Sequence, residues 1–222
     1  MRSGSKFMRR PGWSLGWCIP LMFCMLAVDA GGGSLPSPRL EGERSLEETI
    51  HARRSVRSYG DAALSEEQIA QLCWSAQGLT DRRNRLRAAP SAGGTYPLEL
   101  YVATEQGLYR YKVETHELEV HRETDIRPEL RAAALDQMMV EEAPAVFIIA
   151  ADVRRTERRY GPRAKRYVLM EVGHAGQNIL LQAVALDLGA VPIGAFNDER
   201  VGRIMQLPNG QHPYYIIPVG PP

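Results

Sequence analysis

Arginine side chains gather near the end of the first predicted helix, where they could hold an anion. Residues 53–57 read Arg-Arg-Ser-Val-Arg, so Arg53, Arg54 and Arg57 supply three guanidinium groups and Ser55 supplies a hydroxyl. Guanidinium groups match phosphate oxygens in a bidentate geometry, and each charge-assisted hydrogen bond contributes about 1.5–3 kcal/mol. Taken alone, the segment fits equally well a solvated helix end, where the helix dipole favours arginine.

Two further segments are rich in glycine, proline and small side chains, a composition that lets a ligand approach the backbone. Residues 89–97 read Ala-Pro-Ser-Ala-Gly-Gly-Thr-Tyr-Pro directly before a predicted strand, and residues 191–196 read Val-Pro-Ile-Gly-Ala-Phe. A flat ring can lie against such backbone, although alone the first segment is typical of a tight turn and the second of a bulged strand. The candidate ring-binding residues are Pro90, Ser91, Ala92, Gly93, Pro192, Ile193 and Gly194.

A carboxylate and an imidazole share one face of the longest predicted helix. Glu171 and His174 lie three residues apart, the spacing of neighbours on a helix surface. No third ligand accompanies them, so we expect a helix-surface or dimer contact and no metal site. Cys73 is the only cysteine after residue 30. Its place in a helical pattern predicts a buried structural role, without a disulfide.

Capping patterns and apolar spacing predict the helices that would position these groups. The longest has an apolar stripe of Leu169, Val172, Ala175, Ile179, Ala183 and Leu186. The predicted helices run from the capping box Ser45–Glu48 to about Arg54, from the capping box Ser65–Gln68 to Gly78, from Pro128 to Met139, from Pro162 to Leu188 with Gly189 as its cap, and from Asp198, as N-cap, to Met205.

Strands are predicted where apolar residues alternate or run continuously. Residues 108–113 and 118–121 form a hairpin, which imposes antiparallel pairing on the sheet. Because strands and helices are interleaved around this hairpin, the chain is predicted to be an α+β protein. The other predicted strands are 98–102, the continuous apolar run 145–151 and the terminal strand 214–219, and residues 191–196 are predicted to be extended.

Composition excludes several classes of protein, and the N-terminal residues indicate how the chain is divided. The 222 residues are 44% hydrophobic and 24% charged with a net charge of +1, which excludes collagen-like and disordered chains and gives no sign of a nucleic-acid partner. Residues 1–30 combine basic side chains, an apolar stretch and the small residues Val28 and Ala30, so they predict a cleaved signal peptide and export, with an uncleaved signal anchor as the alternative. Residues 31–44 read as a linker, and residues 45–222 as one domain.

The three candidate segments occur together in the order that resembles the nitroreductase family of flavoproteins. That family combines an Arg-Arg-Ser-x-Arg box, a Pro-Ser-Ala-Gly-Gly loop, a helix carrying Gln-Asn and a Pro-Ile-Gly segment. This chain has residues 53–57, residues 90–94, Gln177-Asn178 and residues 192–194 in that order. The stretch 89–102 and the Glu171 to Asn178 sequence resemble most closely the SagB-type branch, the thiazoline/oxazoline dehydrogenases.

The resemblance implies a central antiparallel sheet flanked by helices, in a homodimer that binds FMN at the subunit interface. It implies that Arg53, Arg54, Ser55 and Arg57 hold the FMN phosphate and ribityl chain. The 90–93 loop would line the ring from one subunit and residues 192–194 would contact it from the other. Hydride chemistry would be supplied by the flavin, with NAD(P)H as one candidate electron donor.

Two positions depart from the pattern of the branch. The azoline-oxidising members carry a Lys-Tyr pair before the long helix, whereas this chain has Arg159-Tyr160. A guanidinium does not lose its proton near neutral pH, so Tyr160 is the one candidate catalytic residue. The chain also ends at Pro221-Pro222 where many relatives place a basic residue near the phosphate.

The predicted function is an FMN-dependent oxidoreductase acting on a small-molecule or peptide-derived substrate. A nitroreductase-like activity and a SagB-type dehydrogenation both remain open. The alternative is a non-catalytic exported protein that binds flavin or a partner. No nucleic acid is expected, and no membrane contact beyond the N-terminal segment.

Overall fold

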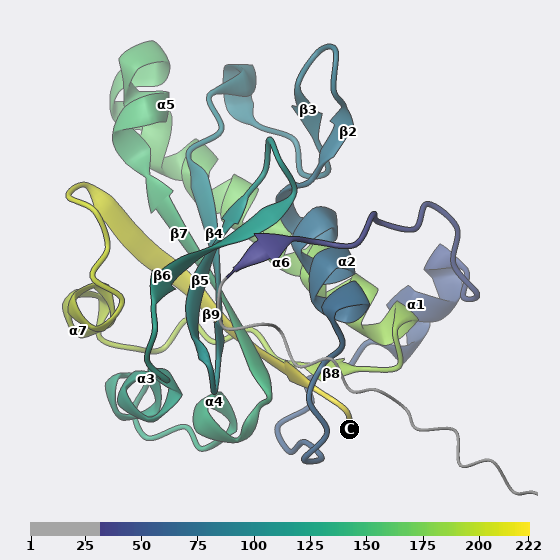
Figure 1. Cartoon of the computed structure of the whole chain (residues 1–222). Helices are drawn as coiled ribbons and strands as arrows, with labels where there is room; N and C mark the ends of the chain where they lie inside the picture. The colour runs from purple at the N-terminus through teal and green to yellow at the C-terminus, as the bar shows by residue number, and fades with distance from the viewer. Residues whose placement is uncertain (1–31) are drawn as a thin grey trace, which may run out of the picture.

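The computed structural model describes residues 32–222, and the predicted signal peptide lies outside these residues. Among the described residues, no helix combines the length and apolar character needed to cross a bilayer. The described chain forms an α+β fold with a central antiparallel sheet flanked by helices, as predicted (Figure 1). The helices are α1 (Leu46–Ala52), α2 (Glu66–Gln77), α3 (Arg127–Ala133), α4 (Met139–Glu142), α5 (Val153–Tyr160), α6 (Ala164–Ala185) and α7 (Asp198–Ile204), with 3-10 turns η1 (Ala92–Gly94) and η2 (Gly161–Arg163).

The main sheet has the strand order β1-β6-β5-β4-β7-β9-β8, and every neighbouring pair in it is antiparallel. A separate short hairpin is formed by β2 and β3. The predicted hairpin is confirmed as β5 and β6, and the predicted run 145–151 is the central strand β7. The strands are β1 (Gly33–Ser34), β2 (Leu79–Asp81), β3 (Leu86–Arg87), β4 (Leu98–Thr104), β5 (Gly107–Lys112), β6 (Glu117–Arg122), β7 (Ala145–Asp152), β8 (Gly189–Ala190) and β9 (Gln211–Gly220).

Helices cover both faces of the sheet, which explains why β7 is a continuous apolar run. Successive side chains of a strand point to opposite faces. Phe147 faces the core formed with α2 and α6, where Cys73 is buried as predicted. Ile148 faces the second core, formed with α3, α4 and α7. A strand buried on both faces has no polar side to show in its sequence.

Both predicted capping boxes are present. The Ser45 hydroxyl accepts a hydrogen bond from the Glu48 amide and the Glu48 carboxylate accepts one from the Ser45 amide. Ser65 and Gln68 make the same reciprocal pair at the start of α2. These pairs satisfy amides that a helix leaves free at its first turn, so the local sequence is sufficient to start both helices.

The helix predicted from Pro128 to Met139 is wrong, because the structure contains two helices there. Leu135 and Asp136 have φ values of 57° and 55°, in the left-handed region. Left-handed residues end the i to i−4 hydrogen-bond ladder, so α3 stops at Ala133 and α4 starts at Met139. The turn lets α3 and α4 pack against each other below the sheet.

Three other helix boundaries differ from the prediction. An unpredicted helix, α5, begins where the Asp152 carboxylate accepts a hydrogen bond from the Arg154 amide, and Gly161 separates it from α6. Helix α6 ends at Ala185, so Gly189 is not its cap. The N-cap of α7 is Asn197, whose side chain accepts from the Arg200 amide at 2.8 Å, rather than Asp198.

The segment expected to be a linker lies against the domain over residues 32–44. Its strand β1 pairs with β6, and the Leu35 amide donates to the His116 carbonyl at 3.0 Å. Farther along, the Arg39 backbone exchanges two hydrogen bonds with the side chain of Gln71 on α2. These contacts give the segment a defined path across α2 that its glycine- and proline-rich composition does not reveal.

Candidate functional site

The arginine segment 53–57 lies directly after α1 and is attached to β8. Arg53 is the C-cap of α1, with its amide donating to the Thr49 carbonyl at 3.0 Å. Ser55 forms a parallel bridge with Ala190, and the Val56 amide donates to the Ala190 carbonyl at 3.1 Å. Backbone contacts therefore fix this segment although it is outside any long element.

Gly189 allows this attachment. A Cβ atom on Gly189 would lie 2.6 to 2.9 Å from the three branched carbons of Val56, closer than real Cβ contacts. Ala190 comes directly before the candidate segment 191–196. In that segment, Ile193 exchanges backbone hydrogen bonds of 2.8 and 3.0 Å with Ile216 of β9. The structure thus brings the 53–57 segment and residues 192–194 to the same end of the domain, as a cofactor spanning both would require.

The side chains of the 53–57 segment differ in their partners. The Arg54 Nη1 group donates to the carbonyls of His51 and Arg53, at 2.9 and 2.8 Å, and so closes the end of α1. Among residues 32–222, neither Arg53 nor Arg57 makes a side-chain hydrogen bond or an ion pair. Ser55 and Arg57 are exposed. Two guanidinium groups and a hydroxyl are thus available to an anion.

The 90–93 loop is held by different elements, near the start of α6. The Ser91 hydroxyl accepts a hydrogen bond from the Tyr96 amide at 2.9 Å, and the Ala92 amide donates to the Glu171 carboxylate at 2.9 Å. Arg159 donates to the Gly93 carbonyl at 3.1 Å. Helices α5 and α6 together therefore hold the loop.

Gly93 is required at the tip of this loop. Its φ of +59° is left-handed, and a Cβ atom there would lie 2.7 Å from the Tyr160 hydroxyl and 2.9 Å from Arg159. The Tyr160 ring packs edge-on against Tyr167, with ring centroids 5.0 Å apart. The structure therefore places the candidate catalytic hydroxyl directly beside the loop predicted to contact the ring.

Glu171 is a site residue whose role the sequence reasoning missed. The prediction of a helix-surface pair with His174 is wrong for Glu171, which is 4% exposed, whereas His174 is exposed. Burial raises the pKa of the Glu171 carboxyl, against the hydrogen bonds from Ala92 and Ser91 that lower it. Its spacing from the buried residues Val168, Val172 and Ala175 puts it on the core face of α6, and this signal was readable in the sequence.

The two halves of the predicted site lie near opposite ends of α6. Glu171, which holds the 90–93 loop, is fourteen residues before the end of the helix at Ala185, about 20 Å along its axis. Figure 1 shows the separation, with α5 at the top of the view and α1 and β8 at the lower right. The hairpin carrying Arg82 to Arg87 is also near the top. One chain therefore does not enclose a ring between both halves.

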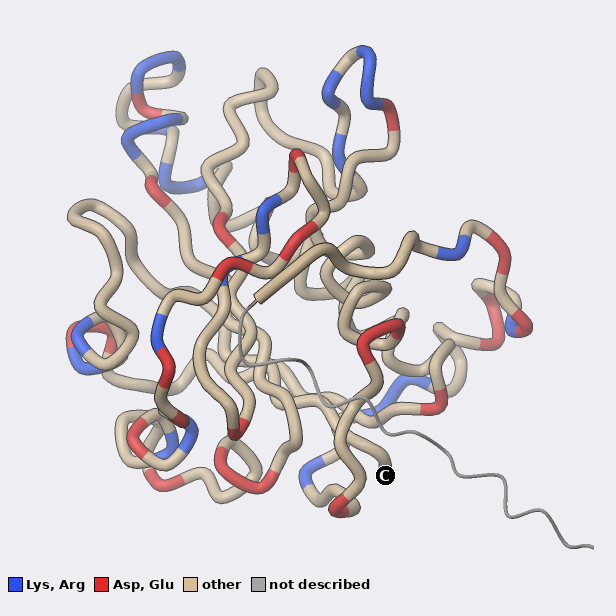
Figure 2. The backbone as a smooth tube through the Cα atoms, viewed as in Figure 1, with Lys and Arg blue, Asp and Glu red and all other residues tan. Residues whose placement is uncertain are grey.

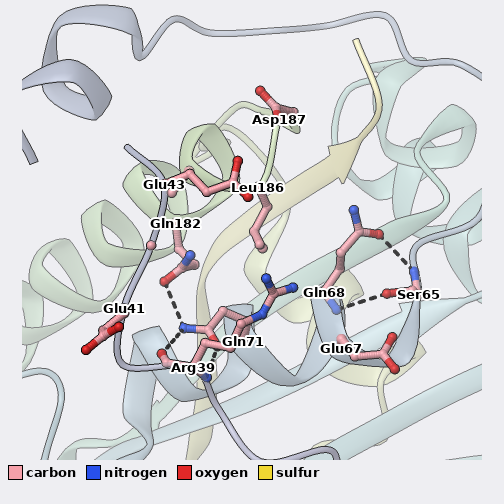
Figure 3. Close-up of a pocket in the computed structure, with 12 residues that line it drawn as sticks. Arg39, Glu41, Glu43, Ser65, Glu67, Gln68, Gln71, Gln182, Leu186 and Asp187 are labelled. Atoms are coloured by element: carbon pink, nitrogen blue, oxygen red, sulfur yellow. Dashed lines mark hydrogen bonds between the residues drawn. The ribbon is translucent and has the colours of Figure 1, made fainter. Parts of the chain in front are cut away.

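A groove elsewhere on the surface, with a volume of about 410 Å³, has no residue of the predicted site in its walls (Figure 3). It lies between the N-terminal segment, α2 and the end of α6. The Gln71 amide group donates to the Arg39 carbonyl at 3.0 Å and to the Gln182 side chain at 3.2 Å. Because these polar groups satisfy one another, the groove serves to attach the N-terminal segment.

Comparison with known proteins identifies relatives across most of the chain. The family described as "Nitroreductase family" matches residues 50–221. A protein of Methanocaldococcus jannaschii that carries a nitroreductase name, MJ1384, is 42% identical over 184 residues, which is 80% of this chain and 91% of that protein.

Two solved structures show the same fold. A crystal structure from Ralstonia eutropha JMP134, named as a nitroreductase, has a TM-score of 0.76 and 27% identity, covering 86% of this chain and 89% of the other. A chain of the Escherichia coli microcin synthetase McbBCD complex with truncated pro-MccB17 bound has a TM-score of 0.67. It is 19% identical and covers 93% of this chain and 84% of the other.

Proposed function

The chain belongs to the nitroreductase family, and from this premise we propose that it is an FMN-dependent oxidoreductase that works as a homodimer. Members of the family typically bind FMN and use NAD(P)H. The observation that carries the proposal is the pairing of the 53–57 segment with Ala190, two residues before the 192–194 segment. Within the described residues, the guanidinium groups of Arg53 and Arg57 have no hydrogen-bond or ion-pair partner, and Gly194 is exposed.

The residues present fit FMN. Arg53, Arg57 and Ser55 would hold the phosphate and ribityl chain, because guanidinium and hydroxyl groups are suited to a dianion and a polyol. The backbone around Pro192 and Gly194 would lie against the ring, together with the 90–93 loop of a second subunit. When bound, FMN supplies hydride transfer between an electron donor and an acceptor. The chain's own residues bind, orient and shield the reactants.

A second subunit would complete the site. On the exposed face of α6, Leu169 and Met170 are 47% and 48% exposed, so the prediction that Leu169 belongs to the core stripe is wrong. Gly173, one turn later, has open space above it. Exposed apolar side chains flanking a glycine suit close approach of a second copy of α6. A two-fold pairing of antiparallel α6 helices would bring the 90–93 loop of one subunit to the 53–57 segment of the other.

The homodimer can be tested with the Leu169→Glu variant. A charge at the centre of this face is expected to weaken dimerisation by about 30-fold or more and to lower FMN retention with it. Light scattering coupled to size-exclusion chromatography measures the first effect and flavin absorbance measures the second. Leu135→Glu is the matched control, since Leu135 is 71% exposed on the opposite side of the sheet. A dimeric, FMN-loaded Leu169→Glu protein would contradict the proposed interface.

The proposed activity is tested by visible spectroscopy of the purified protein with added FMN. We expect a bound flavin spectrum that bleaches under anaerobic NADH or NADPH and returns when an electron acceptor is added. Parallel lines in initial-rate plots would indicate that donor and acceptor use one site in turn. Bound flavin that no donor reduces would favour the non-catalytic binding protein instead. Absence of flavin binding would contradict the proposal.

The sequence motifs and the position of Tyr160 favour a second candidate reaction, the dehydrogenation of a peptide-derived heterocycle. Tyr160 lies beside the 90–93 loop, where its hydroxyl would hold or move a proton at the substrate, and bound FMN would supply the hydride chemistry. We propose export as well, on the basis of residues 1–30. Export would separate the protein from cytoplasmic nicotinamide, and flavin reduction by a substrate rather than by NAD(P)H would then be expected.

A further inference from the structure

Strands β4 and β5 separate before either of them ends. Their pairing begins at Thr104 opposite Gly107 and stops at Tyr101 opposite Arg110. Beyond that point β4 continues to pair with β7, and β5 continues to pair with β6. The diverging ends enclose a cleft of about 260 Å³, which we call the strand cleft. Its charged wall residues are Arg87, Glu99, Arg110, Lys112, Glu114 and Arg155.

One carboxylate in the strand cleft is shared by two arginines. The Glu99 side chain, which is 9% exposed, accepts hydrogen bonds from Arg110 at 3.0 and 2.8 Å and from Arg155. Arg155 also donates to the Tyr96 carbonyl at 3.1 Å, which ties the cleft to the loop beside α5. The two guanidinium groups carry two positive charges and the Glu99 carboxylate carries one negative charge, so the three groups together have a net charge of +1. The hydrogen bonds to Glu99 also hold both guanidinium groups in position.

Arg87 brings a further positive charge to the same cleft, which is also lined by Glu114, a carboxylate that pairs with Arg85. Its guanidinium stacks over the Tyr96 ring at 4.4 Å and donates to the neutral Gln77 side chain at 3.1 Å. Within residues 32–222 it has no ion-pair partner. Arg87 is half-buried, and burial lowers the pKa of its guanidinium, against the nearby Glu114 and Glu99 carboxylates that raise it. A partly desolvated cation gains the most from an anion that reaches it.

The surroundings of the strand cleft are strongly basic. Residues 81–87 and 152–166 carry eleven Lys and Arg side chains against three carboxylates, whereas the whole chain has a net charge of only +1. Figure 2 shows these cations on the β2–β3 hairpin and on α5, at the top of the view. Such a concentration of one sign of charge attracts anions and raises their local concentration.

We propose that the strand cleft is a binding site for an oxyanion, the carboxylate or phosphate group of a small organic ligand. Arg87 would bind the group directly, as would Lys112 by exchanging its ion pair with Glu119, at 3.6 Å, for the ligand. Glu99 would hold Arg110 and Arg155 in place at the wall. The cleft shares no residue with the 53–57 segment or with residues 192–194. This inference therefore goes beyond the proposed flavin chemistry and does not depend on it.

Isothermal titration calorimetry with inorganic phosphate and, separately, with succinate tests the site at constant ionic strength. We expect saturable binding of at least one of these anions. Comparison of the two dissociation constants shows whether the site prefers phosphate or carboxylate. Arg87→Gln should weaken that binding at least about tenfold. Arg83→Gln, an equal charge change at an exposed position on the β2–β3 hairpin, should leave it nearly unchanged.

Two further variants keep the result interpretable. Lys112→Gln should also weaken binding, and it covers the case in which Arg87→Gln fails to fold, as judged by circular dichroism. Arg57→Ala removes a proposed contact to the FMN phosphate, so the binding that remains in this variant should be the binding that Arg87→Gln weakens, which separates the two sites. Absence of saturable binding would overturn the proposal. Equal losses in Arg87→Gln and Arg83→Gln would also overturn it, since they would indicate diffuse attraction to a basic surface.

Discussion

Replacing Arg57 by alanine is expected to weaken FMN binding by about ten- to hundredfold. Arg57 is exposed, and within the described residues it makes no ion pair or side-chain hydrogen bond. Its guanidinium is therefore available to a phosphate without the loss of an existing contact. The Gly60 amide donates to the Pro221 carbonyl at 2.9 Å, so Pro221 lies close to this segment. Quenching of flavin fluorescence measures the dissociation constant.

Arg54→Ala is the matched control for this prediction. Arg54 belongs to the same segment and carries the same charge, but its Nη1 group already binds the carbonyls at the end of α1. We expect a smaller loss of FMN affinity, together with a slight decrease in the stability of α1. Equal losses for Arg54→Ala and Arg57→Ala would show that the segment attracts the phosphate only through its overall charge.

Replacing Tyr160 by phenylalanine is expected to lower kcat by about a hundredfold or more for a reaction that needs a proton at the substrate. The hydroxyl is the only group removed, and FMN binding should remain because the 53–57 segment is distant. The position of the hydroxyl follows from three elements. Helix α5 carries it, Gly93 leaves room for it, and the Tyr167 ring supports its ring from the side.

Tyr167→Phe separates a catalytic role from a packing role. Phenylalanine preserves the edge-on contact between the two rings, so kcat should change by less than about threefold. Stopped-flow measurement of the hydride-transfer step with the FMN-loaded protein gives the rates for both variants. If Tyr160→Phe retains the normal rate with nitro, quinone and heterocyclic substrates, then Tyr160 serves only to hold the 90–93 loop.

Local sequence was sufficient to predict the parts of the structure that depend on near neighbours. The Ser45 and Ser65 capping boxes start their helices because each pair is only three residues apart. The 145–151 run predicted a buried strand because a strand covered on both faces can expose no polar side. The same reading failed at Leu135 and Asp136, because neither residue type requires a left-handed backbone. Both residues lie in the turn between α3 and α4, where the chain changes direction.

Sequence motifs also identified which segments belong to the candidate site, but they gave no information about which of them meet within one chain. Ser55 and Ala190 are 135 residues apart, and their bridge exists because β8 adds to the edge of the sheet beside the end of α1. Similarly, the buried Glu171 holds Ala92 because α6 passes behind the loop. Such long-range contacts depend on the packing of whole elements rather than on local preference.

The amino-acid sequence by itself therefore determined the family, the starts of helices α1 and α2 and the arginine side chains available to an anion. Only the tertiary structure decided that the two halves of the site lie near opposite ends of α6, that Glu171 holds the 90–93 loop and that β4 and β5 diverge close to Arg87. The physical reason is that helix capping and strand burial are decided within a few residues. Strand divergence and the burial of a charge are instead set by contacts between segments far apart in the chain.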